Sequence, residues 1–184
     1  MLAPASSEKL KRLAERLTGW GRATKAEIPD LIIKRKANTY RFRDDGVIPN
    51  HPNWPLVSYR NPVLLPSDVD PAAVFEDLFQ LNGWGRSWRG GIYDYVHYHS
   101  RTHEVLGVAR GKVKLRFGGN RGRLCYGKAG DVFILPAGTG HQCLGASGDF
   151  LVVGAYPPTG SYDECTSSED HNRAVKSILK VVRP

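Results

Sequence analysis

The chain has 184 residues, and 26 Lys and Arg against 18 Asp and Glu give a formal net charge of +8. Hydrophobic residues make up 41% and charged residues 24%, which is ordinary for a globular protein and excludes a chain disordered throughout. Three cysteines without a Cys-x-x-Cys pair exclude a disulfide scaffold, and no run approaches the roughly 18 apolar residues of a membrane span. Because no apolar segment follows Met1, we expect a cytoplasmic protein of one domain with terminal extensions and no membrane partner.

The positive charge lies almost wholly near the N-terminus. Residues 1–43 contain 11 Lys and Arg against 4 Asp and Glu, and the remaining chain is nearly balanced. We predict a basic helix and linker over residues 1–27, in which leucines at helical spacing dock the helix and the cations face water. Contact with a nucleic acid is the less favoured alternative. A helix-turn-helix motif that binds DNA needs a second helix after a tight turn. Here the next segment is Leu31-Ile32-Ile33, which is predicted to be a strand or loop.

Residues 28–160 are predicted to form the main domain. Tyr40 and Phe42 alternate with arginines as in an edge strand, and five prolines between 47 and 66 indicate extended chain, in which His51 reads as a surface residue. A helix is predicted at about 70–82, because Asp70 can cap it and Pro71 suits the first helical position. We read the following segment, 84–91, as a loop that either lines a pocket or packs against a barrel rim.

Beyond Gly91 the pattern changes to short alternating strands between glycine and proline turns, which is typical of a sandwich or barrel with an all-β core. A second helix is predicted in the C-terminal tail, residues 161–184, starting at Ser167 or Ser168. The predicted strands are 112–117, 124–126, 131–135, 141–144 and 150–156.

Three histidines and a glutamate within these strands form a candidate metal site. The spacing of His97 and His99 places both imidazoles on one side of a strand, Glu104 can return on the neighbouring strand, and His141 follows a tight turn. Such a donor set suits a divalent transition metal (Mn, Fe, Ni, Zn, Co or Cu) and not Ca²⁺ or Mg²⁺. The plainer alternative is that these are ordinary strand residues, because a His-x-His pair alone is a weak signal.

The frame around these residues resembles the two motifs of the cupin superfamily. One departure is Gly145, where the second motif usually ends with Asn. The resemblance implies a double-stranded β-helix, or RmlC-like jelly-roll barrel, with flanking helices and a metal inside. It also implies His97, His99, Glu104 and His141 as the metal-binding positions. The matching positions are Gly91, His97-x-His99, Glu104 and Gly111, then Gly130, Pro136-x-Gly138 and His141.

The stretch from Tyr40 to Tyr156 further resembles the stand-alone bacterial cupins of YjlB type, on segments such as Asp44-Asp45-Gly46 and Val153-Gly154-Ala155-Tyr156-Pro157. This resemblance implies a fold and a metal site but no substrate. It also implies a homodimer, to which strands from residues 28–66 could contribute.

Alternate residues of a strand face the same side, and this parity suggests which other side chains lie near the metal. Tyr93 and Tyr95 share the face of the histidines, so the Tyr95 hydroxyl either assists at the metal or bonds a backbone carbonyl. Cys143 shares the parity of His141 but reads best as a small buried hydrophobe. His103 has the opposite parity to Glu104, so we expect it at the rim or orienting a ligand.

Three functions remain open. The favoured one is a metal-dependent enzyme that acts on a small molecule by dioxygenase-like oxidation or isomerase-like chemistry, with Glu104 and Tyr95 assisting proton movement. The second is a non-catalytic module that binds or senses a small ligand or metal. The third, a regulator that binds nucleic acid through the basic N-terminus, is the least favoured. A shared fold does not choose between reactions.

Overall fold

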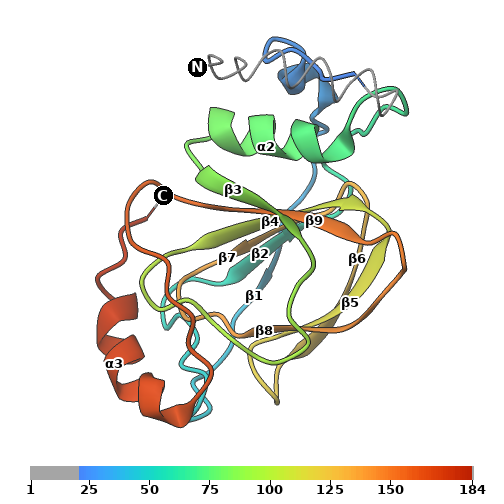
Figure 1. Cartoon of the computed structure of the whole chain (residues 1–184). Coiled ribbons are helices and arrows are strands. Elements are labelled where there is room, and N and C mark those ends of the chain that lie inside the picture. Colours follow the sequence, from blue (N-terminus) through green and yellow to red (C-terminus); the bar gives the residue numbers. More distant parts are fainter. Residues whose placement is uncertain (1–20, 184) are drawn as a thin grey trace, which may run out of the picture.

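Figure 1 shows the computed structural model of the chain, which describes residues 21–183. The predicted N-terminal helix, with its basic face, lies outside these residues. Two antiparallel sheets form the molecule, a six-stranded sheet with strand order β1-β2-β7-β4-β9-β3 and a three-stranded sheet with order β6-β5-β8. This arrangement confirms the predicted jelly-roll barrel with an all-β core.

The six-stranded sheet contains β1 (Asn38–Tyr40), β2 (Leu56–Tyr59), β3 (Gly85–Gly90), β4 (Glu104–Arg110), β7 (Val132–Leu135) and β9 (Leu151–Tyr156). The three-stranded sheet contains β5 (Lys112–Phe117), β6 (Arg123–Lys128) and β8 (His141–Ala146). The helices are the 3₁₀ turn η1 (Ile28–Leu31), α2 (Pro71–Leu81) and α3 (Ser168–Ile178). In the described part of the chain, no helix has the length and apolar character needed to cross a membrane.

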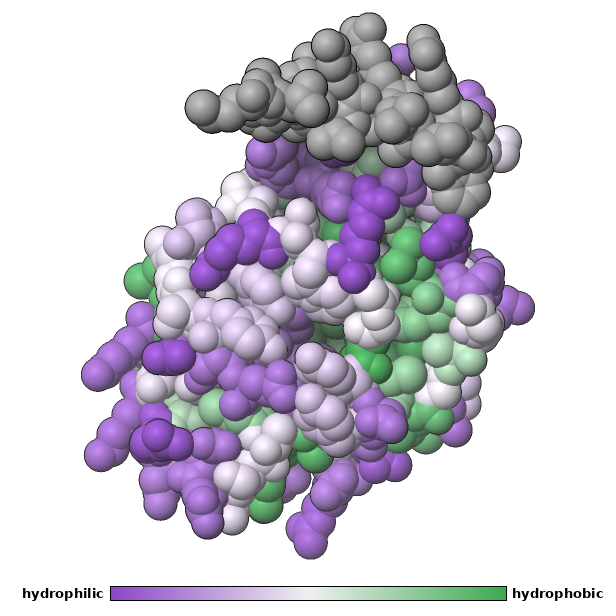
Figure 2. All heavy atoms as spheres, viewed as in Figure 1, coloured by the Kyte–Doolittle hydropathy of each residue, from purple (hydrophilic) through white to green (hydrophobic). Residues whose placement is uncertain are grey.

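The barrel core lies between the two sheets. On β5 the side chains of Leu115 and Phe117 are fully buried, while the alternating Lys114 and Arg116 are partly exposed, as the alternation predicts. They pack against Leu106 of β4 and Phe133 of β7 in the facing sheet. Figure 2 shows hydrophilic side chains over much of the face in view, with apolar residues gathered mainly in its right-hand part. The buried apolar side chains of both sheets form the barrel interior.

Helix α2 begins and ends where the sequence predicts. The Asp70 side chain accepts a hydrogen bond from the Ala72 amide, and Pro71 is the first helical residue. The helix covers the outer face of the six-stranded sheet (Figure 1), with Phe75 fully buried. The Phe75 ring lies so close to Gly107 of β4 that a Cβ atom there would be 2.3 Å from it. A glycine at 107 thus lets the helix approach the sheet.

Two local predictions are wrong. The segment 84–91 is not a loop, because residues 85–90 form β3 at the edge of the sheet and pair with β9. Leu31-Ile32-Ile33, predicted as a strand or loop, is a loop after the end of η1 at Leu31, with an isolated bridge from Ile32 to Val63. His51 is buried, not on the surface, because its ring stacks on Trp54 at 4.5 Å and its Nδ1 accepts a hydrogen bond from the Trp54 amide.

The C-terminal tail folds back along the barrel. Helix α3 begins as predicted, with a capping box in which Ser167 and Asp170 satisfy each other's backbone amides. Its apolar face, with Ala174 and Ile178 buried, packs against Ile48 and Tyr98. The segment between β9 and α3, residues 161–165, passes beside the first motif, since Cys165 forms a β-bridge with Tyr98. This brings the tail to the end of the barrel that holds the candidate site.

Candidate metal centre

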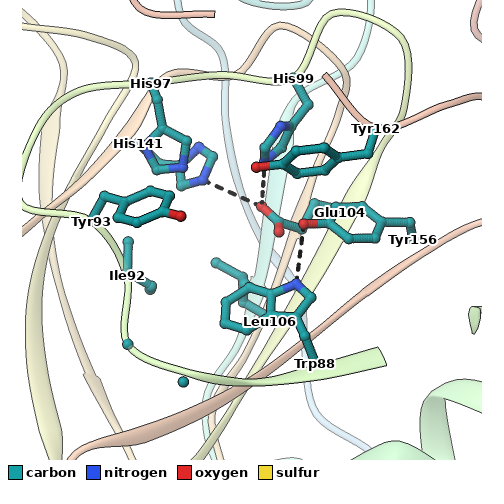
Figure 3. A pocket seen from close by; sticks show the side chains of 12 residues that line it. Trp88, Ile92, Tyr93, His97, His99, Glu104, Leu106, His141, Tyr156 and Tyr162 are labelled. Carbon is teal, nitrogen blue, oxygen red and sulfur yellow. Dashed lines mark hydrogen bonds and ion pairs between the residues drawn. The ribbon is translucent and has the colours of Figure 1, made fainter. Parts of the chain in front are cut away.

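The candidate ligands converge from both sheets at one end of the barrel (Figure 3). Glu104 is the first residue of β4 in the six-stranded sheet, and His141 is the first residue of β8 in the three-stranded sheet. His97 and His141 exchange two backbone hydrogen bonds of 3.1 and 2.9 Å, which tie the first motif to the second. His99 lies two residues further along, on the same side.

The four side chains face one another inside the protein. One ring nitrogen from each of His97, His99 and His141 lies within 4.8 Å of the others, and all three residues are buried. Glu104 Oε2 lies 3.5 Å from His99 Nε2 and 3.3 Å from His141 Nε2. The structure therefore brings together all four residues that the sequence singled out.

The backbone fixes the tautomer of each histidine. The Nδ1 atoms of His97 and His141 lie 3.3 and 3.1 Å from the carbonyl oxygens of Tyr95 and Thr139. His99 Nδ1 similarly contacts the carbonyl oxygen of Asp163. A carbonyl oxygen only accepts, so each Nδ1 carries the proton and each neutral ring has a free lone pair on Nε2. This is the protonation state in which histidine binds a metal.

Burial and mutual charge shift the acid–base behaviour of the cluster. Burial, reinforced by His141 and His99, lowers the pKa of His97 to about 3, so this imidazole is neutral at physiological pH. Burial opposes charge on His99 as well, but the adjacent Glu104 carboxylate outweighs it and raises the His99 pKa. Burial acts against ionised Glu104, yet the contacts with His141 and His99 hold its pKa well below the ordinary value.

A further observation shows that these four side chains fit a metal ion. Glu104 Oε2 is buried and has no hydrogen-bond partner among the described residues. An unpartnered buried carboxylate oxygen is costly, and the neutral form of each histidine turns an Nε2 lone pair toward it. A cation between these atoms would satisfy the carboxylate and the three imidazoles together. Three imidazoles and one carboxylate are ligands for a divalent transition metal.

A pocket of about 490 Å³ opens onto this cluster. Apart from the ligands, its wall is aromatic and aliphatic. Figure 3 shows the rings around the cavity, with the Glu104 carboxylate and the histidines along one side. The residues that line it, besides the four candidate ligands, are Trp88, Gly90, Gly91, Ile92, Tyr93, Leu106, Tyr156 and Tyr162.

Tyr95, His103 and Cys143, which the alternation of strand side chains places near the ligands, lie outside the cluster. Tyr95 is 41% exposed, stacks on Tyr93 and donates its hydroxyl proton to Glu164 at 2.8 Å, so its catalytic role stays a prediction. His103 is fully buried rather than at the rim, and its Nδ1 accepts a hydrogen bond from the Ala137 amide. Cys143 is partly buried against the barrel core, as the plainer interpretation predicts.

Residues 161–165 form a strap that lies beside His99, and the sequence did not predict this contact. Tyr162 lies 4.9 Å from the His99 ring, measured between centroids. The Asp163 side chain accepts hydrogen bonds from the amide and hydroxyl of Ser100 at 2.9 and 2.6 Å. Glu164 accepts hydrogen bonds from Tyr95 and from Tyr162. The first motif and the strap are more than sixty positions apart, so no local pattern could have predicted their contact.

Replacing Asp163 by alanine is expected to weaken metal binding about tenfold, because partners that orient metal ligands contribute roughly that much affinity. The Asp163 side chain fixes the strap whose carbonyl oxygen holds the His99 ring. Competition titration with a chromophoric chelator would measure the affinity. Glu169→Ala, at an exposed position on α3, is the control and should bind as the wild type does. Equal affinity in the two variants would contradict the role of the strap.

No model of a known protein family matches this chain. The chain is 41% identical over 153 residues to "Uncharacterized protein YjlB" of Bacillus subtilis (strain 168), a match that covers 83% of this chain and 89% of that protein.

Similar solved structures include RmlC from Streptococcus suis in complex with dTDP-D-xylose, at 13% identity over 72% of this chain and 73% of that chain, with a TM-score of 0.39. Another is the QdtA 3,4-ketoisomerase from Thermoanaerobacterium thermosaccharolyticum, at 14% identity over 80% of this chain and 100% of that chain, with a TM-score of 0.41. Values this low carry no information about substrate or reaction.

Proposed function

Since this chain belongs to the YjlB family of cupins, we propose that it is a metal-dependent enzyme acting on a small molecule. Its metal ligands would be His97, His99, Glu104 and His141. The single observation that supports this most is the convergence of three Nε2 lone pairs and one unpartnered carboxylate oxygen at the wall of a pocket. Neither a packed core nor a simple hydrogen-bond network requires three buried imidazoles and a carboxylate to face one another.

The ligand set restricts the metal and its chemistry. Three neutral imidazoles favour Mn, Fe, Co, Ni, Cu or Zn over Ca²⁺ and Mg²⁺, which prefer oxygen atoms. A bound divalent transition metal would act as a Lewis acid on a substrate oxygen atom, and a redox-active one would add oxidation. Dioxygenase-like oxidation and isomerase-like proton transfer are the two reaction classes that we propose, as the sequence analysis predicts.

Glu104 is the residue we propose to accept a substrate proton. The Tyr156 hydroxyl also lines the pocket and accepts a hydrogen bond of 3.1 Å from Trp88 Nε1. Because the indole only donates, this bond leaves the Tyr156 hydroxyl proton unused. Burial and the Glu104 charge both raise the Tyr156 pKa, so the hydroxyl stays protonated. Tyr156 would thus offer a proton in the pocket beside Glu104, and Tyr95 could act only from outside the pocket, through Glu164.

Elemental analysis of the purified protein tests the metal site. Wild type expressed in medium containing the six candidate metals should retain about one transition-metal ion per chain, and His141→Ala less than about one tenth of that. His171→Ala is the matched control, because His171 contacts Asp44 on the surface, away from the cluster. Its metal content should equal that of the wild type. Equal content in all three proteins would refute the site. The identity of the metal bound to the wild type would show whether redox chemistry is available.

Two partner predictions from the sequence remain predictions. Strand β1 lies at the edge of the six-stranded sheet, in the region expected to contribute to a homodimer. The predicted N-terminal helix, with four of the eleven Lys and Arg in residues 1–43, lies outside the described residues, and nucleic acid remains the less favoured partner.

A further inference from the structure

The pocket beside the metal centre has a wall chemistry that points to a class of substrate. We propose that it binds a small, uncharged, planar ring compound with oxygen substituents, such as a phenol or a cyclic enol, and that it excludes phosphorylated compounds. The proposal rests on the proposed function, because the substituents would face the metal ligands. It goes further by stating which molecules enter.

Four aromatic side chains surround the cavity, and each is held in place by a neighbour (Figure 3). Tyr93 stacks on Tyr95 with centroids 4.8 Å apart and planes 15° apart. Tyr156 and Tyr162 meet edge to face at 5.5 Å. The Trp88 indole lies against β9 so closely that a Cβ atom on Gly154 would be 2.2 Å from it. Rings fixed before binding offer stacking and edge contacts to a planar ligand at little entropic cost.

The polar atoms on these rings are largely engaged already. Tyr162 donates its hydroxyl proton to Glu164 at 3.0 Å, and the Trp88 indole N–H is taken by Tyr156. Ile92 and Leu106 add aliphatic wall. Figure 3 shows the Tyr93 hydroxyl directed into the cavity, opposite the Glu104 side. The surface offered to a ligand is therefore mainly apolar ring and aliphatic carbon, with polar groups concentrated at the metal ligands.

The charge around the pocket argues against anionic substrates. Among the described residues, no Lys or Arg lines the cavity. Arg86, whose guanidinium lies 5.8 Å from the Tyr156 ring centroid, donates to the Pro157 carbonyl oxygen, and Arg101 pairs with Asp163 at 3.6 Å. The strap adds the carboxylates of Asp163 and Glu164. A phosphate inside the cavity would lose its hydration and gain no arginine or lysine partner from the wall, so that only a bound metal ion would balance its charge.

The volume agrees with a compound of one or two rings. Small-molecule sites are typically ~300–1,000 Å³, and this cavity of about 490 Å³ lies in the lower part of that range. A single ring with two neighbouring oxygen atoms would reach the metal ligands with its oxygen edge while its faces contact the tyrosines.

Isothermal titration calorimetry on the metal-loaded protein tests the proposal with three matched probes. Catechol carries two neighbouring oxygen atoms on a planar ring, trans-cyclohexane-1,2-diol carries them on a puckered ring, and phenyl phosphate carries a ring with a dianion. We expect catechol to bind about tenfold more tightly than either of the others, because ring contacts are worth about that factor. Equal or tighter binding of either the cyclohexanediol or phenyl phosphate would overturn the proposal.

Variants of Tyr162 test whether its ring contacts the bound catechol. Tyr162→Leu should weaken catechol binding about tenfold, and Tyr162→Phe, which keeps the ring, should weaken it less. Tyr162 is 44% exposed, so its replacement leaves the core intact. Tyr126→Leu, at an exposed tyrosine on β6 outside this pocket, is the control and should bind as the wild type does. Unchanged binding by Tyr162→Leu would contradict the role of the aromatic wall.

A comparison of phenol with cyclohexanol on protein without metal tests the ring specificity independently of the metal site. In His141→Ala, phenol should still bind more tightly than cyclohexanol, because the aromatic wall does not include His141. If the wild type binds no metal but this preference persists, the proposed metal site fails and the ring specificity stands. If the wild type binds metal but shows no preference for planar rings, only the ring specificity fails.

Discussion

An excess of a divalent transition metal is expected to raise the thermal unfolding midpoint of the metal-free protein by about 10 °C. A ligand present at about a thousandfold excess over its dissociation constant stabilises the native state by about 4 kcal/mol. In a domain of this size each kcal/mol shifts the midpoint by roughly 2–4 °C. The effect should be global, because Glu104 and His141 begin strands of different sheets and a shared metal would link them. Differential scanning calorimetry after chelator treatment would measure it.

His141→Ala should lose the shift, because one of the ligands is missing and the free energy of metal binding falls with it. His171→Ala should keep the shift in full, since this side chain contacts Asp44 and not the cluster. Mg²⁺ should have little effect on any of the three proteins, because it prefers oxygen ligands. An equal rise with Mg²⁺, or with His141→Ala, would show that metals stabilise the protein somewhere else.

Phe75→Ala is expected to destabilise the protein by about 4 kcal/mol, the middle of the range for deleting a buried phenylalanine. Its ring is fully buried between α2 and the six-stranded sheet, in direct contact with Gly107. Neither neighbour can easily fill the cavity, because the helix is anchored at Asp70 and the facing position is a glycine. Urea denaturation followed by circular dichroism would measure the loss.

Leu81→Ala on the same helix provides the control. Leu81 is 49% exposed, so its truncation should change stability by less than about 0.5 kcal/mol. Folded Phe75→Ala protein should still retain metal, because α2 lies outside the sheets and contributes no ligand. A small effect of Phe75→Ala would mean that the helix is not part of the cooperative core, and loss of metal from the folded variant would mean that α2 positions the site.

Local patterns in the sequence predict the elements that carry the ligands. Alternation predicts β5 with its correct bounds, because side chains on successive strand residues face opposite sides. Capping signals locate α2 and α3, since they act within one helical turn. The spacing of His97 and His99 and the parity of Glu104 depend on the same short-range geometry. The structure brings these residues together with His141.

Where the predictions are wrong, long-range contacts outweigh the local signal. Residues 85–90 are rich in glycine and arginine and read as a loop, yet β9 provides a partner edge that draws them into β3. His51 lies among prolines and reads as a surface residue, but Trp54 stacks on it and His103, fifty-two positions along the chain, lies 6.3 Å away between ring centroids. The pairing of β3 with β9 and the proximity of His103 to His51 join distant segments, so the spacing of nearby residues does not indicate them.

By itself the sequence determined the all-β core and the two described α-helices, because each depends on periodicity or capping over a few residues. The resemblance to the cupin motifs supplied the jelly-roll class, and the same motifs contain the four candidate metal ligands. The tertiary structure alone decided what surrounds those ligands. It placed the 161–165 strap against His99, turned Tyr95 toward Glu164 and brought Trp88 and Tyr156 into the pocket. These pairs lie more than sixty positions apart, and the packing of the whole chain sets their distances. The charge of +8 in the composition likewise says little about the pocket, whose described wall contains no lysine or arginine.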